Sequence, residues 1–155
     1  MKKLAVSNKK IDTILVLDFG SQYTQLIARR GRESDVYSEI LPWDVDEAKL
    51  VNLNPKGVIL SGGPNSVTES YTPRIPQCVF DLDVPILGIC YGMQTIAEQM
   101  GGHVISADQK EFGHSELEIV RDSILFSGLD KKVNVWMSHG AVSYTHLTLP
   151  TILLV

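Results

Sequence analysis

Short apolar runs without a polar face constrain the fold of this chain more than any other feature. Residues 13–17 form one continuous apolar, β-branched run, and residues 56–61 and 86–89 contain two more. A strand with one solvated face alternates apolar and polar residues, whereas a strand buried on both faces does not. Helical patterns lie between the runs, so the sequence predicts βαβ units with right-handed crossovers and a mostly parallel sheet.

The order of the remaining elements follows from the same periodicities and from turn residues. Ser21 is expected to cap the first helix, Asp44 the second, and Gly101 with Gly102 to end the last helix. Two later segments, 117–120 and 133–137, are expected as strands near an antiparallel edge. The sequence predicts an α/β fold with strands at 13–17, 36–41, 56–61, 86–89 and 103–105, and helices at 23–32, 45–51, 77–82 and 95–100.

Length and composition fit one globular domain in a reducing compartment. The chain has 155 residues, of which 44% are hydrophobic and 21% are charged. Its formal charge of −4 argues against a broad nucleic-acid or anionic membrane surface. Two cysteines show no disulfide pattern, and the apolar stretch near Met1 is too short for a signal peptide. We therefore expect a cytoplasmic protein without nucleic-acid or membrane partners.

Cys90 is the first candidate for chemistry. It follows the apolar run 86–89, is framed by Gly88 and Gly92, and precedes a helical pattern. This strand–turn–helix arrangement is the elbow that exposes a nucleophile on a strained turn. The N-terminus of a helix also favours the thiolate form of a cysteine. The alternative is a small apolar cysteine buried in the core.

Three loops are expected to meet at one crevice, because ligands of open α/β sheets bind at the carboxyl ends of the strands. These loops are 18–22, 61–66 and 90–94. The backbone N–H of Tyr91 and an N–H of the Gly62–Gly63 turn could bind a developing oxyanion beside Cys90. The alternative for 61–64 is a simple tight turn.

A general base for Cys90 is difficult to find. Only His114 has an acid two residues away, Glu116, and this spacing is more typical of a solvated strand face than of a catalytic dyad. His139 follows an apolar strand without a later carboxylate, and His146 lies in an unusual tail. No metal site is expected.

The C-terminal tail differs from the rest of the chain. After Lys132 the last 23 residues contain no Asp, Glu, Lys or Arg, and residues 148–155 lack a polar face. Such an end favours aggregation unless it is buried. We expect residues 1–12 to be an N-terminal extension, residues 13–140 to form the domain, and residues 141–155 to be a foreign or frame-shifted tail; the alternative for the tail is a genuine buried strand.

Several motifs resemble those of class I glutamine amidotransferases, the triad-type family. GICYGMQ at 88–94 is similar to the nucleophile motif of the family, and SGGP at 61–64 to its oxyanion motif. LDFGSQYTQLIARR at 17–30, EFG at 111–113 and VWMSHG at 135–140 are similar to one branch, whose synthetase domain aminates ATP-activated XMP to give GMP. The resemblance covers about residues 14–140.

The resemblance implies a flavodoxin-like three-layer domain that is incomplete at its C-terminus, and hydrolysis of glutamine through a thioester on Cys90. It implies that the amides of Gly63 and Tyr91 form the oxyanion hole, and that a substrate-binding set holds glutamine: Gly62, Gln94, Ser138 and His139. The ammonia would pass to a synthetase domain, for which this sequence has no counterpart. The glutaminase domain needs no cofactor, whereas ATP and Mg²⁺ would belong to the synthetase.

One departure from the family pattern affects the expected activity. The family carries its base and the partner of that base in a His-Pro-Glu motif, which this sequence lacks. We therefore expect the domain at residues 13–140 to hydrolyse glutamine with very low turnover. Two alternatives are a non-catalytic glutamine-binding or regulatory module that docks on a synthetase, and the glutaminase subunit of another amidotransferase such as anthranilate synthase.

Overall fold

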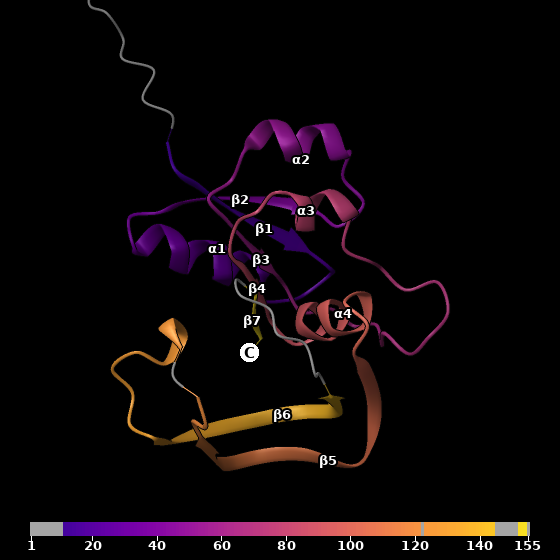
Figure 1. Ribbon diagram of the computed structural model, residues 1–155, viewed down its shortest axis with the longest axis vertical. Helices are drawn as coiled ribbons and strands as arrows, with labels where there is room; N and C mark the ends of the chain where they lie inside the picture. Colours follow the sequence, from indigo (N-terminus) through magenta and orange to yellow (C-terminus); the bar gives the residue numbers. More distant parts are fainter. Residues whose placement is uncertain (1–10, 122, 145–151, 155) are drawn as a thin grey trace, which may run out of the picture.

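The computed structural model describes residues 11–121, 123–144 and 152–154, and only the backbone of 106–112, 137–144 and 152–154. Figure 1 shows its elements. The strands are β1 Thr13–Asp18, β2 Tyr37–Pro42, β3 Gly57–Leu60, β4 Ile86–Gly88, β5 His103–Glu118, β6 Lys132–Tyr144 and β7 Ile152–Leu154. The helices are α1 Thr24–Glu33, α2 Glu47–Leu53, α3 Gln77–Asp81 and α4 Tyr91–Gln99, with a 3-10 turn at Ile124–Phe126.

The first four strands form the parallel sheet that the apolar runs predict. The order of the sheet is β2-β1-β3-β4-β7, and each neighbouring pair is parallel. From β1 the chain moves to β2 on one side and then returns to β3 on the other. The order therefore reverses between β1 and β3, and such a reversal opens a crevice at the carboxyl ends of the strands. The predicted α/β fold is confirmed.

The core lies mainly on one face of this sheet. Leu15 and Leu17 of β1 are fully buried in a cluster with Leu50 of α2, Val79 of α3 and Ile96 of α4. The intervening residue of β1, Val16, is also fully buried, as is Ala28 of α1, but both lie outside that cluster. Because neighbouring strand residues point to opposite faces, α1 covers the second face and the domain has three layers.

β5 and β6 form a separate two-stranded ribbon, which Figure 1 shows below the parallel sheet. They pair antiparallel, as predicted, but in the described chain they are not an edge of the main sheet. Trp136 of β6 is 78% exposed, and Lys132 Nζ lies 2.7 Å from Glu116 Oε1 across the two strands. A ribbon with solvated side chains of this kind cannot supply the buried faces that the parallel sheet needs.

β7 lies beside β4 at the edge of the parallel sheet. Ile86 is opposite Ile152, and Gly88 is opposite Leu154. This segment belongs to the apolar tail predicted as foreign, so part of the tail lies in the sheet; its origin stays a prediction. No helix of the described chain is long and apolar enough to cross a membrane.

Two of the predicted helix caps are wrong. Asp46, not Asp44, caps α2, because its carboxylate accepts the N–H of Ala48 at 2.8 Å. Ser21 does not cap α1, which starts at Thr24 after a turn in which the Ser21 hydroxyl accepts the N–H of Tyr23. In both cases several polar residues precede the helix, and periodicity alone cannot choose among them.

The predicted end of α4 is confirmed, although the helix begins four residues earlier than expected. Gly101 has φ +84° and donates to Glu98 O at 3.1 Å, while Gly102 donates to Ala97 O at 2.7 Å. This pair of hydrogen bonds is a Schellman motif, in which glycine adopts the left-handed conformation without a Cβ penalty.

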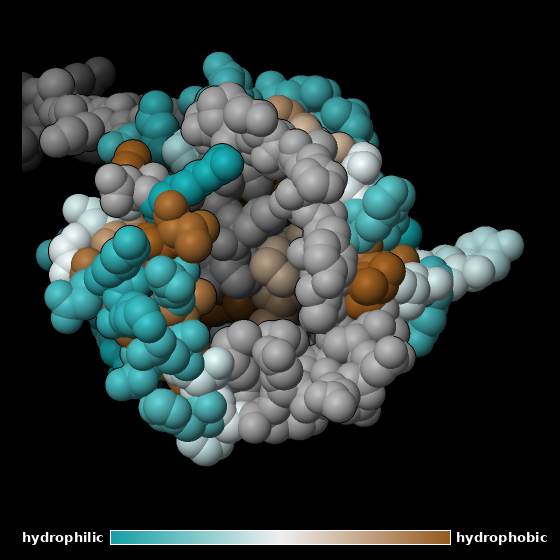
Figure 2. Space-filling view, turned by 60° about the horizontal axis from the view of Figure 1, so that its bottom comes forward, coloured by the Kyte–Doolittle hydropathy of each residue, from teal (hydrophilic) through white to brown (hydrophobic). Residues whose placement is uncertain are grey.

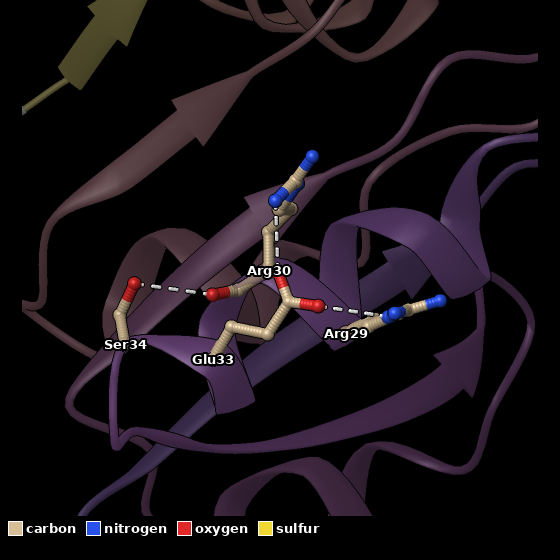
Figure 3. Close-up of polar contacts among 4 residues, drawn as sticks. All are labelled: Arg29, Arg30, Glu33 and Ser34. Carbon is tan, nitrogen blue, oxygen red and sulfur yellow. Dashed lines mark hydrogen bonds and ion pairs between the residues drawn. The ribbon is translucent and has the colours of Figure 1, made fainter.

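The basic end of α1 is partly neutralised by its own acid. Glu33 accepts hydrogen bonds from Arg29 and Arg30, both at 2.8 Å, and the Ser34 hydroxyl donates to Arg30 O (Figure 3). Both arginine side chains are largely exposed, so each ion pair stabilises the helix by only about 0.3–0.5 kcal/mol.

Candidate active site around Cys90

Cys90 stands on a strained turn between β4 and α4. Its backbone has φ +49° and ψ −111°, a combination that non-glycine residues rarely adopt. The residue is exposed. The exposure contradicts the alternative of a buried core thiol, and the strained turn agrees with the nucleophile elbow.

The two framing glycines are required by close packing. A Cβ at Gly88 would lie 2.7 Å from the Cα of Met93 in α4, and a Cβ at Gly92 would lie 2.5 Å from the carbonyl oxygen of Leu60 in β3. Real Cβ atoms do not approach backbone atoms so closely. Without these glycines, α4 could not start directly above the ends of β3 and β4, and the turn at Cys90 would open.

The three predicted loops meet as expected. The N–H of Gly92 donates to Ser61 O at 3.1 Å, which joins the loop after β4 to the loop after β3. A Cβ at Gly62 would lie 3.5 Å from the Cβ of Cys90 and 3.6 Å from the Oγ of Ser21. Gly62 therefore faces both the Cys90 loop and the first loop, so the 61–64 turn is part of the crevice and not an isolated turn.

The two candidate oxyanion donors are both available in the described chain. Tyr91 is the first residue of α4, and its backbone N–H has no acceptor among the described residues. The N–H of Gly63 likewise has none there. A Cβ at Gly63 would lie only 2.6 Å from Phe19 O, so this turn is pressed against the loop after β1. The helix N-terminus at Tyr91 favours negative charge nearby.

Tyr91 also anchors the site through its side chain. The residue is 2% exposed, its ring centroid lies 5.4 Å from that of Phe19, and its hydroxyl donates to Pro73 O at 2.5 Å. The aromatic contact joins α4 to the loop after β1, and the hydrogen bond joins it to the long 61–76 loop.

Gln99 fixes the same long loop and is not apparent from the sequence. Its side-chain amide accepts the N–H of Ile75 at 2.8 Å and donates to the carbonyl of Ile75 at 2.9 Å. Thr95 also donates to the amide oxygen of Gln99 at 3.1 Å. The contacts with Ile75 span 24 residues, and no local pattern predicts them.

Asp18 organises the first loop, and sequence reasoning did not assign it a role. Its Oδ1 accepts hydrogen bonds from the Thr24 hydroxyl at 2.6 Å, from the N–H of Gly20 at 2.9 Å and from the N–H of Ser21 at 3.3 Å. Burial raises the pKa of this carboxyl, but the hydrogen bonds outweigh burial and hold its pKa below the ordinary value of 3.8.

The candidate substrate-binding residues lie in two parts of the fold. Gln94 is in the first turn of α4, where its N–H donates to Cys90 O at 3.1 Å, and it is only partly exposed. Ser138 and His139 lie in β6, opposite Phe112 and Glu111 of β5. Gly62 and Gln94 are therefore in the elbow region, while Ser138 and His139 are on the ribbon, where the structure describes only their backbone.

Among the side chains that the structure describes, neither His103 nor His114 is paired with a carboxylate. Glu116 is paired with Lys132 at 2.7 Å, and His114 is exposed on the ribbon, as expected for a solvated face. His146 lies outside the described residues. In the described part of the chain no group of three His, Cys, Asp or Glu residues could hold a metal ion.

Known proteins resemble both the sequence and the fold. GMP synthase [glutamine-hydrolyzing] from Vibrio cholerae is 60% identical over 127 residues, which cover 82% of this chain and 25% of that protein. The Vibrio vulnificus protein of the same name is 58% identical over 127 residues, which again cover 82% of this chain and 25% of that protein. The chain thus spans about a quarter of the length of these relatives.

Solved structures share the fold. A protein from Thermoplasma acidophilum, described as a candidate GMP synthase subunit, has a TM-score of 0.70 and 28% identity, with 92% of this chain and 75% of that chain covered. A glutamine amidotransferase from Thermotoga maritima has a TM-score of 0.64 and 20% identity, with 86% of this chain and 62% of that chain covered. The class I glutamine amidotransferase profile matches residues 15–153, so the chain belongs to the class I glutamine amidotransferase family.

Proposed function

We propose that this chain is the glutaminase part of a GMP synthase and that Cys90 is its nucleophile. The observation that carries the proposal is the exposed Cys90 on a strained turn, with the Gly62–Gly63 turn beside it. The 60% identity to the Vibrio cholerae protein supports the choice of GMP synthase over another amidotransferase, such as anthranilate synthase.

The proposed reaction begins when the Cys90 sulfur attacks the side-chain carbonyl carbon of glutamine. The amides of Gly63 and Tyr91 would donate to the oxygen as it becomes negative. The C–N bond then breaks, the nitrogen gains the proton that the Cys90 thiol has lost and leaves as ammonia, and a γ-glutamyl thioester remains on Cys90. Water hydrolyses the thioester to glutamate and restores the thiol. Gln94, Ser138 and His139 would hold the amino and carboxylate groups of glutamine.

The ammonia would be used by a synthetase domain that aminates ATP-activated XMP to GMP. ATP and Mg²⁺ would be needed in that domain, and the glutaminase reaction itself would use neither. Glutamine is therefore the proposed small-molecule substrate of this chain, and the synthetase is its proposed partner.

Turnover by this chain is expected to be very low. Its sequence has no His-Pro-Glu, and neither His103 nor His114 is paired with a carboxylate among the side chains that the structure describes. Loss of the base and its partner leaves only binding and oxyanion stabilisation, so we expect ammonia release at least about 10³-fold below that of an intact glutaminase domain. The measurement is ammonia release at saturating glutamine, with Cys90→Ser as background. A rate close to that of the Vibrio cholerae protein would contradict the expectation.

The lack of a His-Pro-Glu motif also favours a second candidate, a non-catalytic module that binds glutamine and docks on a synthetase. Calorimetry with L-glutamine separates the two candidates when it is combined with intact-mass analysis of Cys90. Glutamine binding together with a γ-glutamyl adduct on Cys90 would support the glutaminase. Tight binding without any adduct after long incubation would support the binding module.

A further inference from the structure

Ser61 is a buried polar residue at the centre of the loop junction. It is 0% exposed and follows β3 directly. Its N–H donates to Leu17 O at 3.0 Å, and its Oγ accepts the N–H of Phe19 at 3.0 Å. The position of its hydroxyl is therefore fixed by the backbone of β1 and of the residue that follows it.

The hydroxyl proton of Ser61 has two possible acceptors. Gly62 O lies 2.8 Å from Oγ, and Asp18 Oδ1 lies 3.4 Å away. A hydroxyl has one proton to donate, and O–H···O bonds are strongest near 2.7–2.8 Å. The proton is therefore assigned to the carbonyl oxygen of Gly62.

This hydrogen bond fixes the plane of the peptide between Gly62 and Gly63. The peptide is trans, so the C=O of Gly62 and the N–H of Gly63 point in opposite directions. The carbonyl points to the buried Ser61 hydroxyl, and the N–H points away from it, without an acceptor among the described residues. A hydrogen bond to the carbonyl also polarises the peptide and makes its N–H a better donor.

The geometry points to Ser61 as the positioning residue of the oxyanion hole: its hydroxyl turns the Gly63 N–H toward the carbonyl oxygen that reacts at Cys90. This inference rests on the proposed function. Ser61 does not touch the substrate; it acts through the Gly62–Gly63 peptide. A merely structural Ser61 would satisfy the Phe19 N–H and contribute only to folding.

Two reagents separate these roles in the full chain. The first is a glutamine-shaped chloroketone, in which Cys90 displaces chloride and the ketone oxygen stands where the amide oxygen of glutamine would lie. The second is methyl methanethiosulfonate, which forms a disulfide with Cys90, releases methanesulfinate and has no carbonyl. In Ser61→Ala we expect chloroketone labelling of Cys90 to slow roughly tenfold, less than the loss of a whole oxyanion donor, with an unchanged thiosulfonate rate.

Matched variants complete the experiment. Ser61→Thr keeps the hydroxyl and should restore the chloroketone rate. Thr13→Val removes another buried hydroxyl, which donates to Ile11 O at the amino end of β1, and should change neither rate. If Ser61→Ala does not fold, Ser61→Cys replaces it, because a thiol is similar in size and a weak donor; mass spectrometry of the Cys90 peptide excludes labelling of the new thiol.

The outcomes distinguish this inference from the proposed function. If the wild type reacts no faster with the chloroketone than with a chloroketone that lacks the amino and carboxylate groups, the proposed function fails. If the wild type shows that preference and the glutamine-shaped chloroketone labels Ser61→Ala at the wild-type rate, the inference about Ser61 is wrong. Equal slowing with both reagents would also overturn it, because that result is the signature of a structural role.

Discussion

Gly62 and Gly63 are neighbours with opposite tolerance for a side chain. A methyl group at Gly62 would lie 3.5 Å from the Cβ of Cys90 and 3.6 Å from the Oγ of Ser21, which is ordinary contact, but it would occupy the crevice. We expect Gly62→Ala to leave the unfolding midpoint nearly unchanged and to slow chloroketone labelling of Cys90 markedly.

Gly63→Ala is the matched variant for this test. Its methyl group would lie 2.6 Å from the backbone oxygen of Phe19, so the turn must shift, at a cost of about 1–3 kcal/mol in the free energy of unfolding. Denaturant titration and labelling of both variants provide the comparison. Equal stability of the two variants, or wild-type labelling of Gly62→Ala, would show that the crevice is placed wrongly.

Asp18 makes the first loop sensitive to acid. Its folded-state pKa is lowered below 3.8 because hydrogen bonds from Thr24, Gly20 and Ser21 outweigh the opposing effect of burial. A carboxylate with a lowered folded-state pKa stabilises the fold at pH values above its unfolded-state pKa. This stability is lost as the pH falls through the folded-state pKa. Asp18→Asn should therefore be less stable than the wild type at pH 7, and the difference should shrink between about pH 4 and pH 2.

Denaturant titrations of both proteins across that pH range measure the Asp18 contribution. Asp81→Asn is a suitable control, because Asp81 lies on the exposed side of α3 with only a 3.4 Å hydrogen bond from Gln77. A stability difference for Asp18→Asn that stays constant from pH 7 to pH 2 would contradict this role of Asp18.

At the scale of elements, the long 61–76 loop depends on α4. Gln99 pairs with both backbone groups of Ile75, at 2.8 and 2.9 Å, and Ile75 is 2% exposed. Gln99→Ala leaves these groups without their partner, and we expect a loss of about 1–3 kcal/mol in stability and faster hydrogen exchange at Ile75. Gln77→Ala, on the surface of α3, is the control. Unchanged protection of the Ile75 amide would contradict this role.

The elements also show how far the sequence could predict the fold. Apolar runs predicted β1, β3 and β4, because a strand buried on both faces needs such residues, and the glycine frame predicted the elbow. The predicted caps of α1 and α2 were wrong because several neighbouring residues could cap each helix. The ribbon of β5 and β6 was placed at an edge of the main sheet because strand pairing over many residues leaves no local signal.

At the scale of the whole molecule, the candidate site forms where the strand order reverses. Figure 2 shows apolar side chains, coloured brown, on the side of the molecule where the ribbon lies. The three loops could be predicted from the sequence because the carboxyl ends of parallel strands share one edge. Asp18, Ser61 and Gln99 could not, because their roles come from hydrogen bonds to backbone and side-chain groups that the fold brings to them.

The central claim is that Cys90 is a nucleophile in a crevice that recognises glutamine. The most direct measurement is the rate at which the glutamine-shaped chloroketone labels Cys90, read by peptide mass spectrometry with and without L-glutamine. Cys78 is an internal reference, because burial and the nearby carboxylates of Glu47 and Asp81 raise the pKa of its thiol and so lower the fraction that is thiolate. We expect fast labelling at Cys90 alone, slowed by L-glutamine and not by D-glutamine. Labelling of Cys90 no faster than of Cys78, or without protection by L-glutamine, would contradict the claim.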